Sequence, residues 1–193
     1  PYPEEMNRCL TTVLGELHFA PTQEAKENLL KENVPANSIY VTGNTVIDAL
    51  LAVVEEDYKF KDPTLSALQE SGERLILVEA HRSENLGRPL EEIALAIRDV
   101  VELHHDIQVV LPLHRNPLVR KAFHGILDGV EKIHMIEPLD YKCFINLMNK
   151  AYMVVTDSGG LQEEAPALGV PVLVLRDVTE RPEGVKAGTV RLV

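Results

Sequence analysis

Short hydrophobic runs alternate with longer amphipathic segments along the chain from Arg74 onward. The hydrophobic runs are rich in β-branched residues, and continuous runs of this kind are typical of strands that are covered on both faces of a sheet. The alternation of such strands with helical segments indicates βαβ units. We therefore predict an α/β fold with a parallel sheet. Its predicted strands are residues 74–80, 107–113, 132–139, 152–157, 171–177 and 189–193.

Two of the amphipathic segments have apolar positions three and four residues apart, which is the spacing of one face of a helix. We expect both faces to pack on the sheet as part of the core and not to bind a cofactor. The first face consists of Leu90, Ile93, Ala94, Ile97, Val100 and Val101, and the second of Phe144, Leu147, Met148 and Ala151.

The first 45 residues have a different pattern. Helices are predicted at 3–15 and 22–34, strands at 17–21 and 38–43, and Thr45 is placed to cap a helix over 46–56. The polar segment 57–73 contains Pro63 and Gly72, so we interpret it as the approach to a second sheet. The predicted organisation is the tail of one Rossmann-like domain at 1–45, a connecting helix and linker at 46–72, and a truncated second domain at 73–193. Because the chain starts at Pro1 and stops in an apolar run, we expect a slice of a longer protein.

Composition and charge exclude several classes of protein. The 193 residues are 45% hydrophobic and 25% charged, as in an ordinary globular domain and unlike a disordered, collagen-like or coiled-coil protein. The net charge of −11 opposes binding to nucleic acid or an anionic membrane, so an anionic ligand needs a local binding device. Cys9 and Cys143 lack a zinc-ligand spacing, and no hydrophobic run reaches the ~20 residues of a membrane helix. We expect a soluble cytoplasmic protein without a metal site.

A glycine-containing turn follows the predicted strand 152–157. Ser158, Gly159 and Gly160 lead from Asp157 into a short helix. Glycines let a ligand approach the backbone, and free amides at the start of a helix attract anions, so this turn is suited to a phosphate. The residues match neither GxGxxG nor GxxxxGK[ST], which excludes those two nucleotide-binding motifs. An ordinary turn between a strand and a helix remains the alternative.

Charged side chains follow this turn. Glu163 and Glu164 lie in the first turn of the helix, where a carboxylate either binds the hydroxyl groups of a ribose or complements the helix dipole. We favour the dipole role for Glu163, whereas both roles stay open for Glu164. Arg176 and Arg181 follow the next strand, at the edge where open α/β sheets bind ligands, and suit a phosphate or a polar sugar.

Histidines end two other predicted strands. His81 and Arg82 follow the strand 74–80, and His114 follows the strand 107–113. The carboxyl ends of parallel strands share one edge of the sheet, so these groups are candidates for ligand contact. A purely structural role for His81 is equally compatible with the sequence. We interpret the remaining histidines as surface or packing residues.

Five segments together resemble the non-hydrolysing bacterial UDP-N-acetylglucosamine 2-epimerases. They are PYPEEMNR at 1–8, TGNTVIDAL at 42–50, AHRSENLG at 80–87, DSGGLQEEAP at 157–166 and RDVTERPEGVKAGT at 176–189, in the order of the family. The resemblance implies a glycosyltransferase-B type architecture, here incomplete, in which two Rossmann-like domains hold UDP-GlcNAc in a cleft. It also implies a homodimer at full length and a role in cell-envelope polysaccharide biosynthesis.

The resemblance assigns roles to individual residues. It places the turn Ser158–Gly160 at the diphosphate, Glu164 at the ribose hydroxyls, Phe144 in the uracil pocket and Arg181 at the sugar or phosphate. His81 would stand at the diphosphate near the leaving group.

Acidic and allosteric positions also follow from the resemblance. Glu4 would be one of the acidic residues of the reaction centre, so that Glu4 and His81 are the catalytic residues of this chain. Relatives that resemble the Gram-positive enzymes bind a second UDP-GlcNAc as an allosteric activator. Glu4, Arg82 and His114 match contacting positions of that second site.

The reaction that the resemblance implies interconverts UDP-GlcNAc and UDP-ManNAc. UDP leaves by anti elimination to give a 2-acetamidoglucal, and it returns as C2 is reprotonated from the other face. This chemistry needs a carboxylate base, a second acid and stabilisation of the departing diphosphate, without a metal or a nicotinamide cofactor. A glycosyltransferase of the same architecture and a UDP-binding fragment without activity are the alternatives.

The sequence also departs from the pattern of the family. Most of the first domain of the family is absent, including the family positions for an Asp and a further Glu of the reaction centre. The C-terminal helices of the family are absent as well. Glu79 stands where a Thr or another small residue is common, and Arg115 stands where a Leu is usual. Glu79 therefore adds a carboxylate near the expected diphosphate site.

Overall fold

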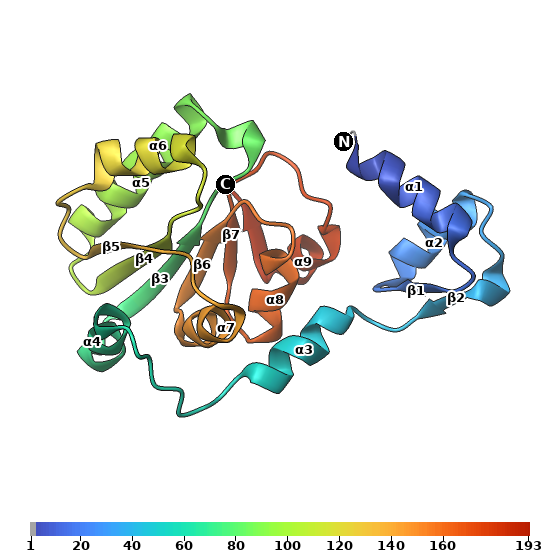
Figure 1. Cartoon of the computed structure of the whole chain (residues 1–193), viewed down its shortest axis with the longest axis horizontal. Helices are drawn as coiled ribbons and strands as arrows, with labels where there is room; N and C mark the ends of the chain where they lie inside the picture. The colour runs from blue at the N-terminus through green and yellow to red at the C-terminus, as the bar shows by residue number, and fades with distance from the viewer. Residues whose placement is uncertain (1–2) are drawn as a thin grey trace. The chain divides into compact units, whose positions relative to one another are not determined.

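A computed structural model describes residues 3–193, and the chain forms two units (Figure 1). The first unit ends at Leu51, and the second spans Ala52–Val193. Pro1 and Tyr2, which begin the first of the family-like segments, lie outside the described residues. Among residues 3–193, none of the helices combines the length and the hydropathy that a bilayer crossing requires.

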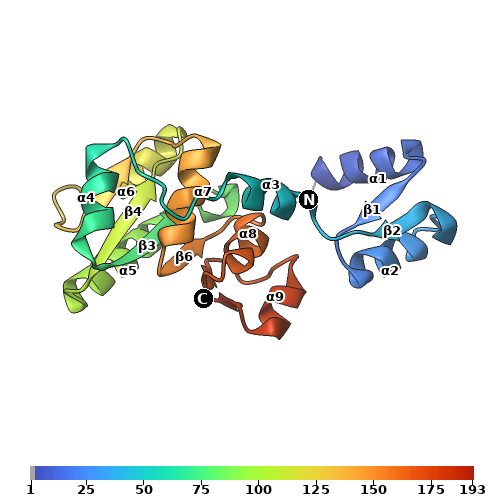
Figure 2. The same ribbon diagram turned by 90° about the horizontal axis from the view of Figure 1, so that it is seen from below.

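The first unit contains two short parallel strands with a helix on either side of the pair (Figure 2). Thr22 begins the second helix by accepting a hydrogen bond from the Ala25 N–H at 3.1 Å. The small core of this unit consists of the buried Ala20, Val34 and Ile39. The elements are α1 (Glu4–Leu14), β1 (His18–Ala20), α2 (Gln23–Lys31), the 3₁₀ turn η1 (Ala36–Ser38) and β2 (Ile39–Val41).

The second unit is built on a six-stranded sheet in which all neighbouring strands are parallel. The strand order is β5-β4-β3-β6-β7-β8. This is the order of a doubly wound Rossmann-like sheet, and it confirms the predicted α/β fold. The strands are β3 (Arg74–Glu79), β4 (Ile107–Pro112), β5 (Ile133–Ile136), β6 (Met153–Thr156), β7 (Val172–Val174) and β8 (Val190–Leu192).

Helices cover the sheet on both faces. The chain moves outward from β3 to β5 and then returns through β6 to β8, so right-handed crossovers place the helices of the two halves on opposite faces. Figure 1 shows α5 and α6 on one side of the sheet and α7 and α8 on the other. The unit boundary falls inside α3 (Thr45–Val53). The helices of the second unit are α4 (Pro63–Ser71), the 3₁₀ turn η2 (Ser83–Asn85), α5 (Arg88–Leu103), α6 (Pro117–Leu127), α7 (Tyr141–Lys150), α8 (Leu161–Ala167) and α9 (Pro182–Ala187).

Both predicted apolar faces contribute to the core. On α5, Leu90, Ala94, Ile97 and Val101 are buried against strands β3 and β4 and helix α6. On α7, Leu147 and Met148 are fully buried, whereas Phe144 is only half-buried. Phe144 is therefore not fully enclosed by the core.

Two local details differ from the expectations. The segment 57–73 leads into β3, but it also contains the unpredicted helix α4, which starts with an Asp62 side-chain cap and a first-turn proline and ends at Gly72 in the left-handed conformation. The helix α3 is capped by Asn44, whose Oδ1 accepts the Val46 N–H at 3.1 Å, and not by Thr45, which is its first residue. Asparagine serves this role as well as threonine does.

Candidate functional site

The direction of winding reverses between β3 and β6, and the functional segments lie there. In open α/β sheets, ligands bind outside the carboxyl ends of the strands at this switch point. His81 and Arg82 follow β3, and Asp157 and the turn Ser158–Gly160 follow β6. The strand order therefore brings together two motifs that are more than seventy residues apart in the sequence.

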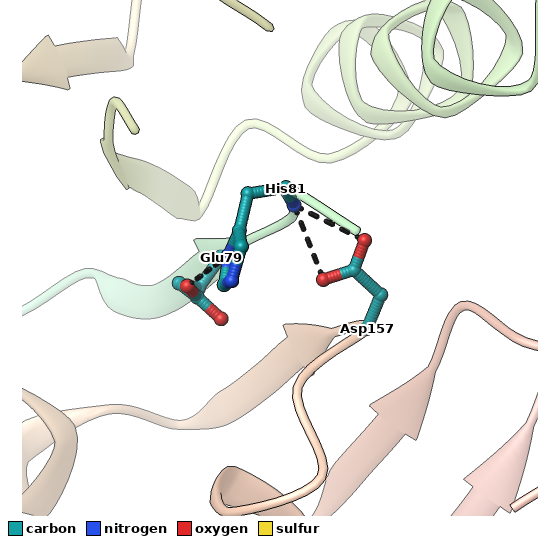
Figure 3. Close-up of side chains that lie close together, drawn as sticks. All are labelled: Glu79, His81 and Asp157. Atoms are coloured by element: carbon teal, nitrogen blue, oxygen red, sulfur yellow. Dashed lines mark hydrogen bonds and ion pairs between the residues drawn. The ribbon is translucent and has the colours of Figure 1, made fainter. Parts of the chain in front are cut away.

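The buried Asp157 carboxylate ties the two motifs together. It accepts the His81 N–H at 3.1 Å (Figure 3), the Arg82 N–H at 2.9 Å and the Asn85 side-chain amide at 2.8 Å. Asn85 also donates to the Leu175 carbonyl at 3.3 Å, so it links these loops to the end of β7. Sequence reasoning assigned no function to Asp157.

A second set of contacts leads from the glycine-containing turn to His81. The Ser158 N–H donates to Thr156 Oγ1 at 3.0 Å, and Thr156 Oγ1 donates to Glu79 Oε2 at 3.0 Å. The other carboxylate oxygen, Glu79 Oε1, lies 2.5 Å from the buried Nδ1 of His81 (Figure 3). This ion pair raises the pKa of His81 above its ordinary value, although partial burial acts in the opposite direction.

His114 lies against His81. The two rings stack with their centroids 4.8 Å apart and an interplanar angle of 11°. His114 Nδ1 accepts the Asn116 N–H at 3.1 Å, so neutral His114 carries its proton on Nε2. The structure thus places the two predicted histidines side by side at the carboxyl edge of the sheet.

The turn Ser158–Gly160 presents unpaired backbone donors. The N–H groups of Gly159, Gly160 and Leu161 donate no hydrogen bond within residues 3–193, whereas the Ser158 N–H is taken by Thr156. These three donors precede or begin α8, where an anion is favourably placed. The turn therefore has the donors that its sequence predicted, with the difference that Ser158 can contribute only its hydroxyl group.

Glu164 lies next to this turn. A Cβ atom at Gly160 would lie 3.4 Å from Glu164 Oε1, so the carboxylate is next to the turn. Burial raises the pKa of Glu164, and the negative charges of Glu163 and Glu79 add to that effect. Glu164 forms no ion pair with a cationic side chain of residues 3–193, and a half-buried carboxylate without such a partner is costly to the fold, which favours a role in ligand binding.

The segment after β7 is held by polar contacts to α8. Arg181 forms an ion pair with Glu163, which therefore has a specific partner besides the helix dipole. The Arg181 N–H donates to Thr179 Oγ1 at 3.0 Å, and Thr179 Oγ1 donates to the buried Gln162. Gln162 in turn donates to the Ser158 carbonyl at 3.1 Å. These bonds fix Arg181 in relation to the turn.

Two further acidic residues, Glu84 and Glu180, form ion pairs with Arg176. Arg176 is mostly buried and pairs with Glu84 at 3.3 Å and with Glu180 at 2.7 Å. Glu180 lies directly against Gly159, because a Cβ atom there would come within 2.5 Å of Glu180 Oε1. A side chain at Gly159 would displace the end of the flexible Glu180 side chain, so the packing here disfavours a larger residue but does not by itself require glycine.

Not every predicted site residue belongs to this edge. Glu4 is exposed on α1 in the first unit. Phe144 lies on α7 of the second unit, half-buried, one turn after the Asp140 cap of that helix. Arg115, the other departure from the family pattern, is exposed after β4.

Glu79, His81 and Asp157 offer ligand atoms within 4.8 Å of one another, as a metal site would. The Asp157 oxygens already accept the hydrogen bonds described above, and Glu79 contacts His81 directly. Hydrogen bonding and the ion pair account for all three groups without an ion.

A groove of about 840 Å³ lies elsewhere in the second unit. Its walls are mostly apolar side chains of β3, β6, β7 and α5, with polar groups from Asn85 and Arg176. The turn Ser158–Gly160, His81 and Glu164 do not line it. We therefore distinguish this groove from the polar site at the switch point.

Comparisons with known proteins match the chain over its whole length. A family model described as UDP-N-acetylglucosamine 2-epimerase matches residues 1–193. A Bacillus subtilis protein named UDP-N-acetylglucosamine 2-epimerase is 54% identical over 192 residues, which cover 100% of this chain and 50% of that protein. The chain thus spans about half the length of the curated relatives that it matches.

Solved structures show the same fold. The UDP-GlcNAc 2-epimerase of Neisseria meningitidis bound to UDP-GlcNAc matches with a TM-score of 0.88 and 48% identity, over 100% of this chain and 53% of that one. The S. aureus MnaA–UDP co-structure matches with a TM-score of 0.92 and 48% identity, over 99% of this chain and 51% of that one.

Proposed function

Because the chain belongs to the UDP-N-acetylglucosamine 2-epimerase family, we propose that its complete protein interconverts UDP-GlcNAc and UDP-ManNAc by elimination and re-addition of UDP. The observation that carries the proposal is the turn Ser158–Gly160. Its unpaired amides lie at the switch point of the sheet beside the half-buried Glu164, which is the arrangement that a nucleoside diphosphate requires.

The described residues have complementary roles in this proposal. The amides of Gly159, Gly160 and Leu161 bind the diphosphate, and Glu164 accepts hydrogen bonds from the ribose hydroxyls. Phe144, which is half-buried, contributes its ring to the uracil pocket. Arg181, oriented by Glu163 and Thr179, approaches the sugar or a phosphate oxygen.

His81 acts at the leaving group. Elimination places additional negative charge on the departing diphosphate, and a protonated imidazole near it lowers the energy of that state. The ion pair with Glu79 favours the protonated form. Glu4 is the candidate for an acidic residue of the reaction centre, and proton transfer at C2 needs such a carboxylate.

Exchange of the C2 proton with solvent tests the proposed reaction. The protein, expressed from its complete reading frame, should convert UDP-GlcNAc in heavy water to a mixture of the two epimers with deuterium at C2. Mass spectrometry and proton NMR measure the label. Epimers without solvent label would contradict elimination, and consumption of UDP-GlcNAc that depends on an added acceptor would indicate a glycosyltransferase instead.

We also propose that the complete protein is a cytoplasmic homodimer. Cys9 and Cys143 are free thiols, which fits a reducing compartment. Light scattering coupled to size-exclusion chromatography measures the oligomeric state, and a monomer at micromolar concentration would contradict the dimer.

A further inference from the structure

The Glu79 carboxylate contacts two other residues of the candidate site, Thr156 and His81. Glu79 is the last residue of β3, and its two carboxylate oxygens face different partners. One accepts a hydrogen bond from Thr156 on the adjacent strand β6, and the other lies 2.5 Å from His81 Nδ1. Its side chain is 20% exposed, so a carboxylate at this position is largely withdrawn from water and stays there because both oxygens are engaged.

We infer that Glu79 is a positioning residue: through Thr156 it connects the backbone of the phosphate-binding turn to His81, and it holds the imidazole by Nδ1 so that Nε2 is the nitrogen that serves the diphosphate. The inference rests on the proposed function, because it assumes that a diphosphate occupies the turn. It goes further by assigning a role to a side chain that does not contact the ligand itself.

The geometry supports each step of this connection. The Ser158 N–H is fixed by Thr156 Oγ1 at 3.0 Å, and the same hydroxyl group donates to Glu79. A hydroxyl group has one proton, so a bond donated to Glu79 leaves the oxygen lone pairs to accept the Ser158 N–H. The position of the turn and the position of the carboxylate therefore depend on one another.

The imidazole is constrained on two further sides. His114 stacks on the ring face of His81, and the Asp157 carboxylate accepts the backbone N–H of His81. With the backbone held and one face covered, the ion pair to Glu79 sets which ring nitrogen remains for a ligand (Figure 3).

Several charged groups act on the protonation of His81. Glu79 from β3 and Asp157 after β6 both favour the imidazolium ion, whereas the adjacent Arg82 and partial burial disfavour it. Stacked His114 is a second titratable group. Glu79 is the largest of the favourable influences, and its removal should lower the pKa of His81.

The test compares Glu79→Gln with the unmodified chain in two measurements. The first is a pH titration of the His81 ring by NMR in the absence of ligand, with its signal assigned by its loss in His81→Asn. The second is the dissociation constant of UDP by calorimetry at pH 5.5 and pH 7.5. Because the terminal phosphate of UDP also titrates near pH 6, the variant and the unmodified chain are compared at each pH.

Glu79→Gln should bind UDP more weakly at pH 7.5, by up to about tenfold, and nearly equally at pH 5.5, because an imidazole with an ordinary pKa near 6.5 is only about one-tenth protonated at pH 7.5. The NMR titration of the variant should show a lower His81 pKa. Glu92→Gln, which removes an exposed carboxylate of α5, is the control and should change neither measurement.

Variants of Thr156 test the connection of Glu79 to the turn separately from its contact with His81. Thr156→Val removes the hydroxyl group and should weaken UDP binding at both pH values, whereas Thr156→Ser keeps it and should retain the affinity. An unchanged His81 titration in Glu79→Gln, or an equal loss of affinity at both pH values, would overturn the positioning role. A chain that does not bind UDP at all would overturn the proposed ligand, while the ligand-free titration would still decide the contact between Glu79 and His81.

Discussion

Individual side chains at the switch point carry a cost to the fold, which is consistent with the proposed binding of a ligand there. Glu164 is the clearest example, because burial and two neighbouring carboxylates raise its pKa in the folded state. A carboxyl group with a raised folded pKa binds its proton more tightly when folded than when unfolded. Its contribution to stability is therefore favourable at low pH and is lost as the pH rises from about 4.5 through the folded pKa.

The direction of this effect on stability separates the two roles that the sequence left open for Glu164. If Glu164 serves ribose binding, Glu164→Gln should unfold at higher urea concentration than the unmodified chain at pH 7, and the difference should vanish near pH 4. The same variant should bind UDP about tenfold or more weakly, because hydrogen bonds to a charged acceptor are the strong ones. Urea unfolding at both pH values and UDP calorimetry measure these effects.

A dipole role would give the opposite result. Glu164→Gln would then be less stable at pH 7 than the unmodified chain, with unchanged UDP affinity. Glu183→Gln is a matched control, because Glu183 is also an acidic residue in the first turn of a helix, α9, away from the turn Ser158–Gly160.

The sequence predicted the residue types at this site better than their contacts. Ser158, Glu164, His81 and Arg181 were all candidates, and all lie in the second unit at the carboxyl ends of its strands or on the segments that follow them. The contacts of Asp157 were missed because they depend on the order of strands that are distant in the sequence. A signal was available: an aspartate directly after a buried strand needs donors, and the switch point of the sheet supplies them.

Secondary-structure elements were predicted well where a repeating apolar pattern defined them. The strands and the helices α5 and α7 follow from periodicity, because burial on a sheet imposes it. The helix α4 was missed although Asp62, Pro63 and Gly72 are ordinary start and stop signals, because its residues include few apolar positions and only Leu65 is buried. Capping signals carried more information there than hydrophobicity did.

The turn Ser158–Gly160 and α8 together give a prediction about binding. Gly160 has φ −66° and ψ −44°, which any L-residue adopts, and a Cβ atom there would meet only Glu164 Oε1, at 3.4 Å. Gly160→Val should therefore change the free energy of unfolding by no more than about 1–2 kcal/mol, the range for a poor residue at a helix cap. It should nevertheless obstruct a ligand that approaches the backbone amides.

Ser158→Ala is the comparison, because it removes one hydroxyl group that is worth about 1 kcal/mol, or roughly fivefold in affinity. UDP titration should show a larger loss for Gly160→Val than for Ser158→Ala. Equal and unchanged affinities of the two variants would mean that the turn only connects β6 to α8.

The chain as a whole spans about half the length of its curated relatives, and this limits what it should do alone. Its second unit contains a six-stranded sheet with the turn Ser158–Gly160 that is proposed to bind phosphate, together with His81 and Glu164. The first unit contributes only two strands of three residues each, with Glu4 on its first helix. Ligand binding and catalysis should therefore be separable in this chain.

The 193-residue chain should bind UDP weakly and show no measurable epimerisation of UDP-GlcNAc. Catalysis requires several groups held within hydrogen-bond reach of one sugar, and the loss of each oriented acid or base costs about two to four powers of ten in rate. The assay compares the chain with the full-length B. subtilis relative under identical conditions. Epimerisation by the purified chain that disappears in His81→Ala would show that these residues suffice for the reaction, and it would contradict the requirement for a second half of the cleft.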